Sequence, residues 1–205
     1  PVLLERIKNG VESNIDGQAA PVRWLYARAK DAFARKVRGE AGKRDALVLA
    51  LADQVLFQRI QQRVGGRLRC LICGSAPLGE DTQRWFEMLG ITVYQVYGLT
   101  ETSAIVTMDT PAGRVVPGRV GPALKGVDVR LGEGEEIQVQ GPNIFDRYWE
   151  RPDATQGAFT EDGWFRTGDR GEVDDQGNWR IIGRVKNILV PSSGHNVAPE
   201  PLEQR

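Results

Sequence analysis

Histidine and cysteine are scarce in this chain, and neither sign of charge is in excess. The 205 residues include one histidine and two cysteines, and the formal net charge is zero. A nucleic-acid surface needs an excess of Lys and Arg, so the balanced charge argues against nucleic acid as a partner. The single histidine, His195, can join a Ser–His–Asp triad only if distant segments assemble one, and a loop or surface position is the simpler interpretation.

Several sequence signals are also missing. The chain contains no run of about 18 apolar residues, so no transmembrane helix is predicted. No charged-then-apolar leader opens it, so no secretion signal is visible. Neither a GxxxxGK[ST] phosphate loop nor a GxGxxG fingerprint is present, which leaves the usual phosphate-loop and dinucleotide interpretations without support.

The two cysteines form a CxxC pair, Cys70 and Cys73, within a predicted strand. Three residues apart on a strand, their side chains point to opposite faces. A zinc site would also need a second pair of ligands, which the sequence does not offer. We therefore predict ordinary unpaired thiols, and these fit a reducing, cytoplasmic compartment.

Periodicity predicts helices first and strands later. Apolar residues recur at helical spacing over residues 1–64, with breaks at Ser13-Asn14 and Gly17 and at 39–43. A strand at 68–73, a helix at 78–89 and a strand at 91–96 then follow. This strand–helix–strand order predicts a βαβ unit in an α/β sheet.

Beyond about residue 115, glycine becomes dense and the predicted strands are short. They are expected at 127–131, 136–140, 164–167, 171–173 and 179–182. The turn at 174–177 between the last two predicts a hairpin.

The predicted fold class is α/β. Residues 1–115 form part of a mixed or parallel sheet with packed helices, including the helical N-terminal stretch. Residues 116–184 form a small antiparallel β-barrel-like domain. Residues 185–205 are expected to hold a hinge and the beginning of a C-terminal α+β domain, and we expect that domain to be cut short because about 20 residues cannot bury a core.

Two strand ends in the predicted sheet carry loops suited to a ligand. Gly74-Ser-Ala-Pro-Leu78 has small residues that let a flat ligand approach the backbone at the carboxyl end of a strand. The alternative is an ordinary strand-to-helix turn with a proline near the helix start. The second loop lies in Tyr94-Gln-Val-Tyr-Gly-Leu-Thr-Glu-Thr102, where Gly98 provides a bend.

The side chains of this second loop suggest a nucleotide site. Tyr97 is a flat aromatic that can stack on a base, and the hydroxyls of Thr100 and Thr102 can contact a phosphate or a metal. Glu101 is a hard oxygen ligand suited to magnesium. A solvated turn with a capping acid remains the alternative, but two neighbouring loops of this kind favour a nucleotide.

Two later segments add polar candidates. Asp169, in Gly163-Trp-Phe-Arg-Thr-Gly-Asp169, can accept two hydrogen bonds from ribose hydroxyls, although a surface-turn aspartate is common. Arg184, in Gly183-Arg-Val-Lys-Asn187, can pair with an anion, or can belong to the charged edge of a hairpin.

In this order and spacing the segments resemble the adenylate-forming superfamily of acyl- and aryl-CoA synthetases, luciferases and peptide-synthetase adenylation domains. Tyr97-Gly-Leu-Thr-Glu101 is similar to the tyrosine–glycine–x–threonine–glutamate motif of that family, and Phe165-Arg-Thr-Gly-Asp169 to its arginine–threonine–glycine–aspartate motif. Gly183-Arg184 with the residues after it resembles the hinge motif, and Gly74-Ser-Ala-Pro-Leu78 the adenine loop.

The resemblance implies a nucleotide site on the first two motifs. Gly74, Ser75 and Ala76 would line the adenine and the acyl channel. Gln95 would face the adenine amino group, and Tyr97, followed by Gly98, would stack on the ring. The implied catalytic residues are Thr100, which would contact the phosphate, and Glu101, which would hold Mg²⁺.

The later motifs complete the implied site. Asp169 would bind both ribose hydroxyls, and Arg184 would add a further ribose contact. Lys186 occupies the position of the hinge residue, and Ser193 and Gly194 would lie beside the pantetheine arm of coenzyme A.

The implied activity is an AMP-forming fatty acid–CoA ligase that uses ATP, Mg²⁺ and coenzyme A. A serine-, threonine- and glycine-rich phosphate loop and a C-terminal catalytic lysine, both found in the family, are absent, so we predict that this chain alone does not turn over. The segment Ser192-Ser-Gly-His-Asn-Val-Ala-Pro199 resembles the corresponding segment of long-chain enzymes. A medium-chain or aryl acid as the substrate stays open, and so does a non-catalytic adenine-nucleotide-binding module. We expect a cytoplasmic location, and leave open both peripheral membrane contact of the parent protein and its oligomeric state.

Overall fold

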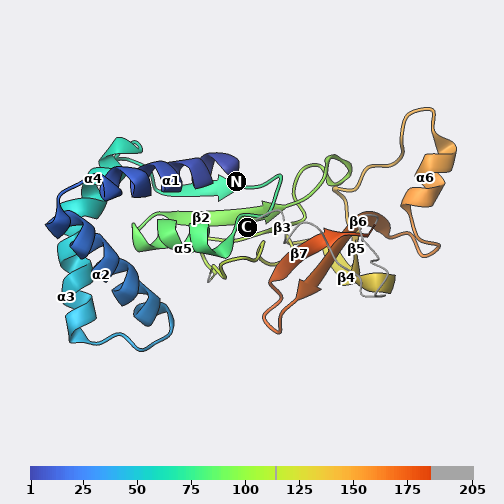
Figure 1. Ribbon diagram of the computed structural model, residues 1–205. Helices are drawn as coiled ribbons and strands as arrows, with labels where there is room; N and C mark the ends of the chain where they lie inside the picture. Colours follow the sequence, from blue (N-terminus) through green and yellow to red (C-terminus); the bar gives the residue numbers. More distant parts are fainter. Residues whose placement is uncertain (114, 186–205) are drawn as a thin grey trace, which may run out of the picture. The chain divides into compact units, whose positions relative to one another are not determined.

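A computed structural model describes residues 1–113 and 115–185, and it divides into two compact units (Figure 1). Unit 1 consists of Pro1–Leu71 and Glu80–Val93. Unit 2 consists of Ile72–Gly79 and the described residues from Tyr94 onward. Each unit is described by itself below.

Unit 1 is built of helices. They are α1 (Val2–Asp16), α2 (Ala20–Val37), α3 (Lys43–Ala52), the π-helical turn Asp53–Phe57, α4 (Gln58–Arg63) and α5 (Glu80–Met88). Helix α1 ends at Gly17, and α3 begins where the Gly42 amide donates to Asp45 Oδ2 at 2.9 Å. The predicted helical stretch is confirmed, with its breaks at Gly17 and at 39–43. The break predicted at Ser13-Asn14 is wrong, because both residues lie within α1. None of the helices in residues 1–113 and 115–185 has the length and apolar character that a membrane crossing requires.

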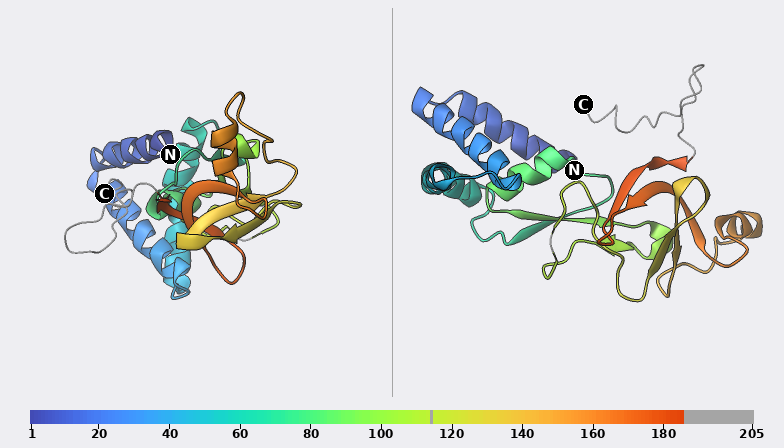
Figure 2. Two further views of the ribbon diagram at one scale, coloured as in Figure 1. Left: turned by 90° about the vertical axis from the view of Figure 1, so that its right-hand side faces the viewer. Right: turned by 90° about the horizontal axis from the view of Figure 1, so that it is seen from below.

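The core of unit 1 lies between these helices, with α1 and α2 side by side (Figure 2). Ala29 and Ala32 on α2 are fully buried, which lets neighbouring helices approach closely. One polar link runs through this core, because Trp85 Nε1 donates to the hydroxyl of Tyr26 at 2.7 Å. That hydroxyl in turn donates to Glu12 Oε1 at 2.9 Å, so the buried phenol is fully satisfied.

A three-stranded sheet runs from unit 1 into unit 2. Its order is β1 (Cys70–Cys73), β2 (Thr92–Tyr97) and β3 (Thr107–Met108). Strands β1 and β2 point the same way and are connected through α5, and β3 pairs antiparallel with β2 (Figure 1). The βαβ prediction and the mixed sheet are confirmed, whereas β3 was not predicted.

A four-stranded antiparallel sheet lies in unit 2. Its order is β4 (Asp128–Leu131), β5 (Glu136–Gln140), β6 (Phe165–Val173) and β7 (Trp179–Arg184). The sheet is curled, as the predicted barrel-like domain requires (Figure 2). The helix α6 (Pro152–Ala158) precedes β6 and was not predicted.

The sequence prediction of separate strands at 164–167 and 171–173 is wrong, because both belong to β6. The glycine between them, Gly168, has a φ of +71° and bends the strand without ending it. Pairing with β5 continues past the bend, from Arg166 to Arg170, through a register shift between Glu136 and Gln138. The hairpin after β6 is confirmed, and Asp174 Oδ1 accepts the Gln176 and Asn178 amides at 2.9 Å each.

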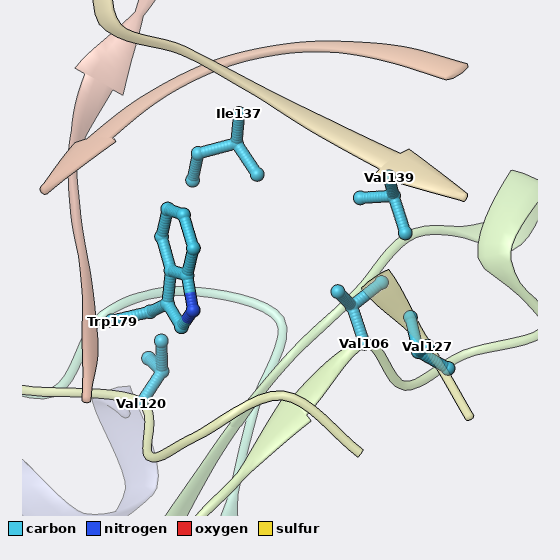
Figure 3. Packing of buried hydrophobic residues seen from close by; sticks show 6 residues of the cluster. All are labelled: Val106, Val120, Val127, Ile137, Val139 and Trp179. Atoms are coloured by element: carbon cyan, nitrogen blue, oxygen red, sulfur yellow. The ribbon is translucent and has the colours of Figure 1, made fainter. Parts of the chain in front are cut away.

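The apolar core of unit 2 lies beneath the four-stranded sheet (Figure 3). Its buried members are Val106, Val120, Val127, Ile137, Val139 and Trp179. The indole of Trp179 lies between the side chains of Ile137 and Val120 (Figure 3). Side chains of this kind contribute about 1.5–3 kcal/mol each when buried. Val106 and Val120 belong to this one core, although they lie on either side of residue 115 in the sequence. The domain boundary predicted at residue 115 stays a prediction.

Candidate functional site

All candidate residues within the described part of the chain belong to unit 2. They come from the loop after β1, from the end of β2 and the loop behind it, and from β6 and β7: Gly74, Ser75, Ala76, Gln95, Tyr97, Gly98, Thr100, Glu101, Asp169 and Arg184. The remaining candidates, Lys186, Ser193 and Gly194, lie outside the described residues, as does His195.

Asp169 on β6 is the centre of the site. Its side chain is buried, with the residue only 5% exposed. The Tyr97 hydroxyl donates to its Oδ2 at 2.7 Å, and Arg184 Nε donates to its Oδ1 at 2.9 Å. The structure therefore brings together three predicted residues from β2, β6 and β7. Arg184 and Asp169 are register partners in the β6–β7 pair, which places the guanidinium beside the carboxylate.

The phenol of Tyr97 stays protonated in this arrangement. Burial raises its pKa well above the usual value, and the negative charge of Asp169 raises it further. Tyr97 is consequently a neutral donor to the carboxylate at any physiological pH. The Asp169 amide donates to the Thr167 hydroxyl at 3.1 Å, and that hydroxyl donates to the Ile137 carbonyl at 2.7 Å, so the backbone under the carboxylate is also held.

Gln95 fixes the loop that follows β1. Its side chain is buried, and Oε1 accepts the Leu78 amide at 3.0 Å. The backbone amide of Gln95 donates to Asp109 Oδ2 at 2.8 Å. Burial raises the pKa of Asp109 to about 6, against the opposing effect of this hydrogen bond. The predicted adenine contact of Gln95 stays a prediction, whereas its link to the loop is present in the structure.

The loop after β1 packs closely against a side chain of β2. A Cβ on Gly74 would lie 2.6 Å from Val96 Cγ2, so a larger residue would push the loop away from β2. Ser75 takes a φ of +71°, which is unusual for a residue with a side chain. Ser75 and Ala76 are both exposed, so their backbone is open to a ligand.

The loop after β2 turns sharply at Gly98. A Cβ there would lie 2.2 Å from the Ala104 carbonyl oxygen, so only glycine fits. A short 3₁₀ turn, Thr100–Thr102, follows. Thr102 is fully buried, and its hydroxyl bonds to the amide and carbonyl of Leu99 at 2.9 and 3.0 Å. The expectation that Thr102 offers its hydroxyl to a phosphate is therefore wrong, since the turn itself uses that group, whereas Thr100 is exposed.

Glu101 carries a carboxylate with a partner that the sequence analysis missed. The Tyr148 hydroxyl donates to Glu101 Oε1 at 2.9 Å, and the Phe145 amide donates to the Glu101 carbonyl at 2.8 Å. The aromatic residues around Tyr148 were the visible signal in the sequence. No spacing rule connects them to a residue 47 positions earlier.

The residues present fit magnesium held together with a phosphate substrate. Residues 1–113 and 115–185 contain no group of three or more His, Cys, Asp or Glu side chains that can hold a metal. Magnesium keeps several waters and commonly takes one or two carboxylates plus substrate phosphates, so a lone Glu101 suits it in that setting. Cys70 is partly buried and Cys73 is buried, and both are free thiols.

A family model described as AMP-binding enzyme matches residues 27–149. The chain belongs to this family. The match covers the loops after β1 and β2 and the segment that carries Tyr148. It ends before the strands that carry Asp169 and Arg184.

Similar curated proteins carry ligase names. Long-chain-fatty-acid–CoA ligase FadD15 of Mycobacterium tuberculosis is 38% identical over 156 residues, covering 76% of this chain and 26% of that protein. Long-chain-fatty-acid–CoA ligase 6 of Homo sapiens is 36% identical over 216 residues, covering 98% of this chain and 30% of that protein. The chain thus spans about a quarter to a third of the length of the curated relatives that it matches.

Solved structures agree with the fold. The ATP-bound MatB of Rhodopseudomonas palustris is 38% identical with a TM-score of 0.60, covering 72% of this chain and 33% of that one. A malonyl-CoA ligase in a product complex with methylmalonyl-CoA and AMP is 33% identical with a TM-score of 0.56, covering 86% of this chain and 40% of that one.

Proposed function

We propose that this chain supplies the adenosine- and magnesium-binding part of an AMP-forming fatty acid–CoA ligase. In that reaction a fatty acid carboxylate attacks the α-phosphorus of ATP, giving acyl-AMP and pyrophosphate. The thiol of coenzyme A then displaces AMP and gives acyl-CoA. Membership of the AMP-binding enzyme family and the ligase names of the relatives support the proposal.

The single observation that carries the proposal is the buried Asp169 between Tyr97 and Arg184. An ionised carboxylate only accepts hydrogen bonds, which is the property that binding of two ribose hydroxyls requires. A flat adenine next to the ribose meets the exposed loop Gly74–Ala76 and the ring of Tyr97.

Glu101 and Thr100 serve the phosphates in this proposal. Charge develops on the phosphate oxygens during adenylation, and neutralising it is the main way in which a protein accelerates phosphoryl chemistry. Magnesium bound at Glu101 supplies that neutralisation. The exposed hydroxyl of Thr100 donates to a phosphate oxygen and orients it.

The fatty acid is the finer part of the proposal. The ligase names of the curated relatives favour a long chain, and the malonyl-CoA ligase structure supports a short dicarboxylic acid as the second candidate. We also propose a cytoplasmic location for the protein, with peripheral contact to membranes where long-chain acids dissolve. Since the chain spans about a quarter to a third of its relatives, we expect turnover to need the rest of that length.

Calorimetric titration of the chain with AMP tests the proposal. In the Asp169→Asn variant, which keeps the shape but removes the charge, we expect AMP affinity to fall by about tenfold or more. The matched control is Asp162→Asn in the same unit, where an exposed carboxylate pairs with Arg130 at 2.7 Å. Equal AMP affinity in wild type and Asp169→Asn would overturn the proposed site.

A further inference from the structure

A second segment of unit 2 holds the loop that carries Glu101. The segment 143–148 contacts this loop through both backbone and side chains. Asn143 Nδ2 donates to the carbonyls of Thr102 and Ile105 at 3.0 and 3.1 Å, and its own carbonyl accepts the Ser103 hydroxyl at 2.9 Å. We call residues 143–148 the clamp segment.

The clamp segment also contacts Glu101 itself, at two points. The Phe145 amide donates to the Glu101 carbonyl at 2.8 Å, which fixes the backbone. The Tyr148 hydroxyl donates to Oε1 at 2.9 Å, which fixes the carboxylate. Within the described residues, no hydrogen bond or ion pair reaches the other oxygen, Oε2. One oxygen is thus held and the other is open.

The clamp segment is itself anchored in an aromatic cluster. The ring of Phe145 lies 4.7 Å from that of Tyr148, 5.6 Å from that of Phe159 and 5.4 Å from that of Phe165, between centroids. Such ring pairs contribute about 0.5–1.5 kcal/mol each beyond the area they bury. Phe165 begins β6, so the sheet that carries Asp169 also supports Tyr148.

We propose that Tyr148 is a positioning residue for the metal-binding carboxylate of Glu101, a role that rests on the proposed function. The hydroxyl holds Oε1 and so restricts rotation of the carboxylate, which directs Oε2 to the cation. A hydrogen-bond donor behind a metal ligand orients that ligand. It thereby reduces the conformational entropy that the carboxylate would otherwise lose when the metal binds. The ring of Tyr148 supports the loop, and the hydroxyl sets the direction of the carboxylate.

Mn²⁺ added to the ¹⁵N-labelled chain in the presence of inorganic pyrophosphate, which supplies the phosphate oxygens, tests the role without nucleotide or turnover. Mn²⁺ takes the same oxygen ligands as Mg²⁺ and broadens the amide signals of residues close to it. We expect the signals of Thr100 to Ser103 to broaden first in the wild type. Tyr148→Phe, which removes only the hydroxyl, is expected to need about ten times more Mn²⁺ for the same broadening.

Four variants separate positioning of the carboxylate from support of the loop. Glu101→Gln is expected to lose the selective broadening, and Tyr94→Phe, which removes a phenol from β2 on the face opposite to Gln95, to behave as the wild type. Tyr148→Phe without metal is expected to leave the amide shifts of Thr100 to Ser103 nearly unchanged. Asn143→Ala is expected to shift them, because it removes two hydrogen bonds to the loop backbone.

Two results would overturn the proposal. Equal Mn²⁺ dependence in wild type and Tyr148→Phe would show that the hydroxyl does not position the carboxylate. Absence of selective broadening in the wild type, or its survival in Glu101→Gln, would show that Glu101 does not hold the cation. The AMP titration with Asp169→Asn is independent of both, so failure of the ribose site and failure of the Tyr148 role are distinguishable.

Discussion

Acidic side chains are placed differently in the two units. Among the described residues, the buried carboxylates are Asp109, Glu136 and Asp169, and all three belong to unit 2. The acids of unit 1 lie nearer the surface, and four of them pair with Lys or Arg, as Glu12 does with Lys30 at 2.9 Å. A buried carboxylate loses hydration that only specific donors replace.

This difference shows that the chain buries carboxylates, at a cost in hydration free energy, in unit 2. Unit 1 follows the ordinary rule of apolar helix faces inside and charge outside. Unit 2 keeps Asp169 buried with Tyr97 and Arg184 as dedicated donors, and every described candidate residue lies in the same unit. Buried charge of this kind marks functional sites more often than it serves stability. The predictions below test whether nucleotide binding is confined to unit 2.

The largest effect on unit 1 is expected from Phe57→Ala. Phe57 is 2% exposed, and deleting its ring leaves a cavity that lowers the free energy of unfolding by about 3–5 kcal/mol. AMP affinity should stay unchanged wherever unit 2 remains folded, because no candidate residue lies in unit 1. Denaturant unfolding followed by circular dichroism measures the first quantity and calorimetry the second.

The matched change in unit 2 is Trp179→Ala. Trp179 is 5% exposed, so the stability loss should be similar, but AMP binding should be lost with it. A fall in AMP affinity for Phe57→Ala as large as that for Trp179→Ala would break the comparison between the units.

A smaller loss of stability is expected from Gly98→Ala. The added Cβ would lie 2.2 Å from the Ala104 carbonyl oxygen, so the loop after β2 has to move, which costs about 1–3 kcal/mol. The movement displaces Thr100 and Glu101, so ATP affinity in the presence of Mg²⁺ should fall more than AMP affinity. The two titrations are run on the same preparation.

The control is Gly157→Ala in α6, where a new Cβ meets nothing within 4 Å. This change replaces a glycine in the last turn of α6 and should stabilise the chain by about 0.5 kcal/mol without affecting either ligand. Unaltered ATP affinity in Gly98→Ala would show that the loop after β2 does not contact the phosphates.

Asp109→Asn is expected to stabilise the chain by about 1–2 kcal/mol at pH 7. Burial raises the pKa of Asp109 to about 6, so the folded state keeps a proton that the unfolded state has already released near pH 4. The free energy of unfolding therefore falls as pH rises from about 4 to about 6 and is flat above that range. In Asp109→Asn this fall should disappear, as pH-dependent denaturant unfolding can measure.

Asp45→Asn in unit 1 is expected to change the free energy of unfolding in the opposite direction. Its hydrogen bond to Arg35 holds its pKa below the usual value, so its contribution is present at neutral pH and is lost as the pH falls through that lowered pKa. Asp45→Asn should therefore destabilise the chain at pH 7 where Asp109→Asn stabilises it. The same sign for both variants would contradict the distinction between buried and surface acids.

The sequence was sufficient for most elements but not for the contacts between distant ones. Helical periodicity and glycine breaks located α1 and α2, and the alternation of strand and helix located β1, α5 and β2. Strand β3 has two residues and α6 has seven, which is too short for a period to emerge from local pattern. The bend at Gly168 resembled the end of a strand, because pattern alone does not show that pairing continues past it.

The candidate site was likewise predictable from the sequence only in part. Motifs singled out Tyr97, Asp169 and Arg184 just beyond the ends of predicted strands. The structure places them on β2, β6 and β7 and joins them at one carboxylate. The contact between Tyr148 and Glu101 spans 47 residues of chain and depends on the folded aromatic cluster, so no local signal announces it. The nucleotide roles of these residues stay predictions until the titrations are made.

The smallest effect is expected from Arg38→Gln in unit 1. Arg38 Nε lies 2.8 Å from Glu40 Oε2, and both side chains are more than half exposed. Water and salt screen such a pair, so the free energy of unfolding should change by less than about 0.5 kcal/mol, and AMP affinity should not change. Arg184→Gln makes the same substitution opposite the buried Asp169 and should lower AMP affinity severalfold, because the carboxylate loses its guanidinium donor. Equal AMP affinities for the two arginine variants would mean that burial of the partner carboxylate does not decide which ion pairs serve binding.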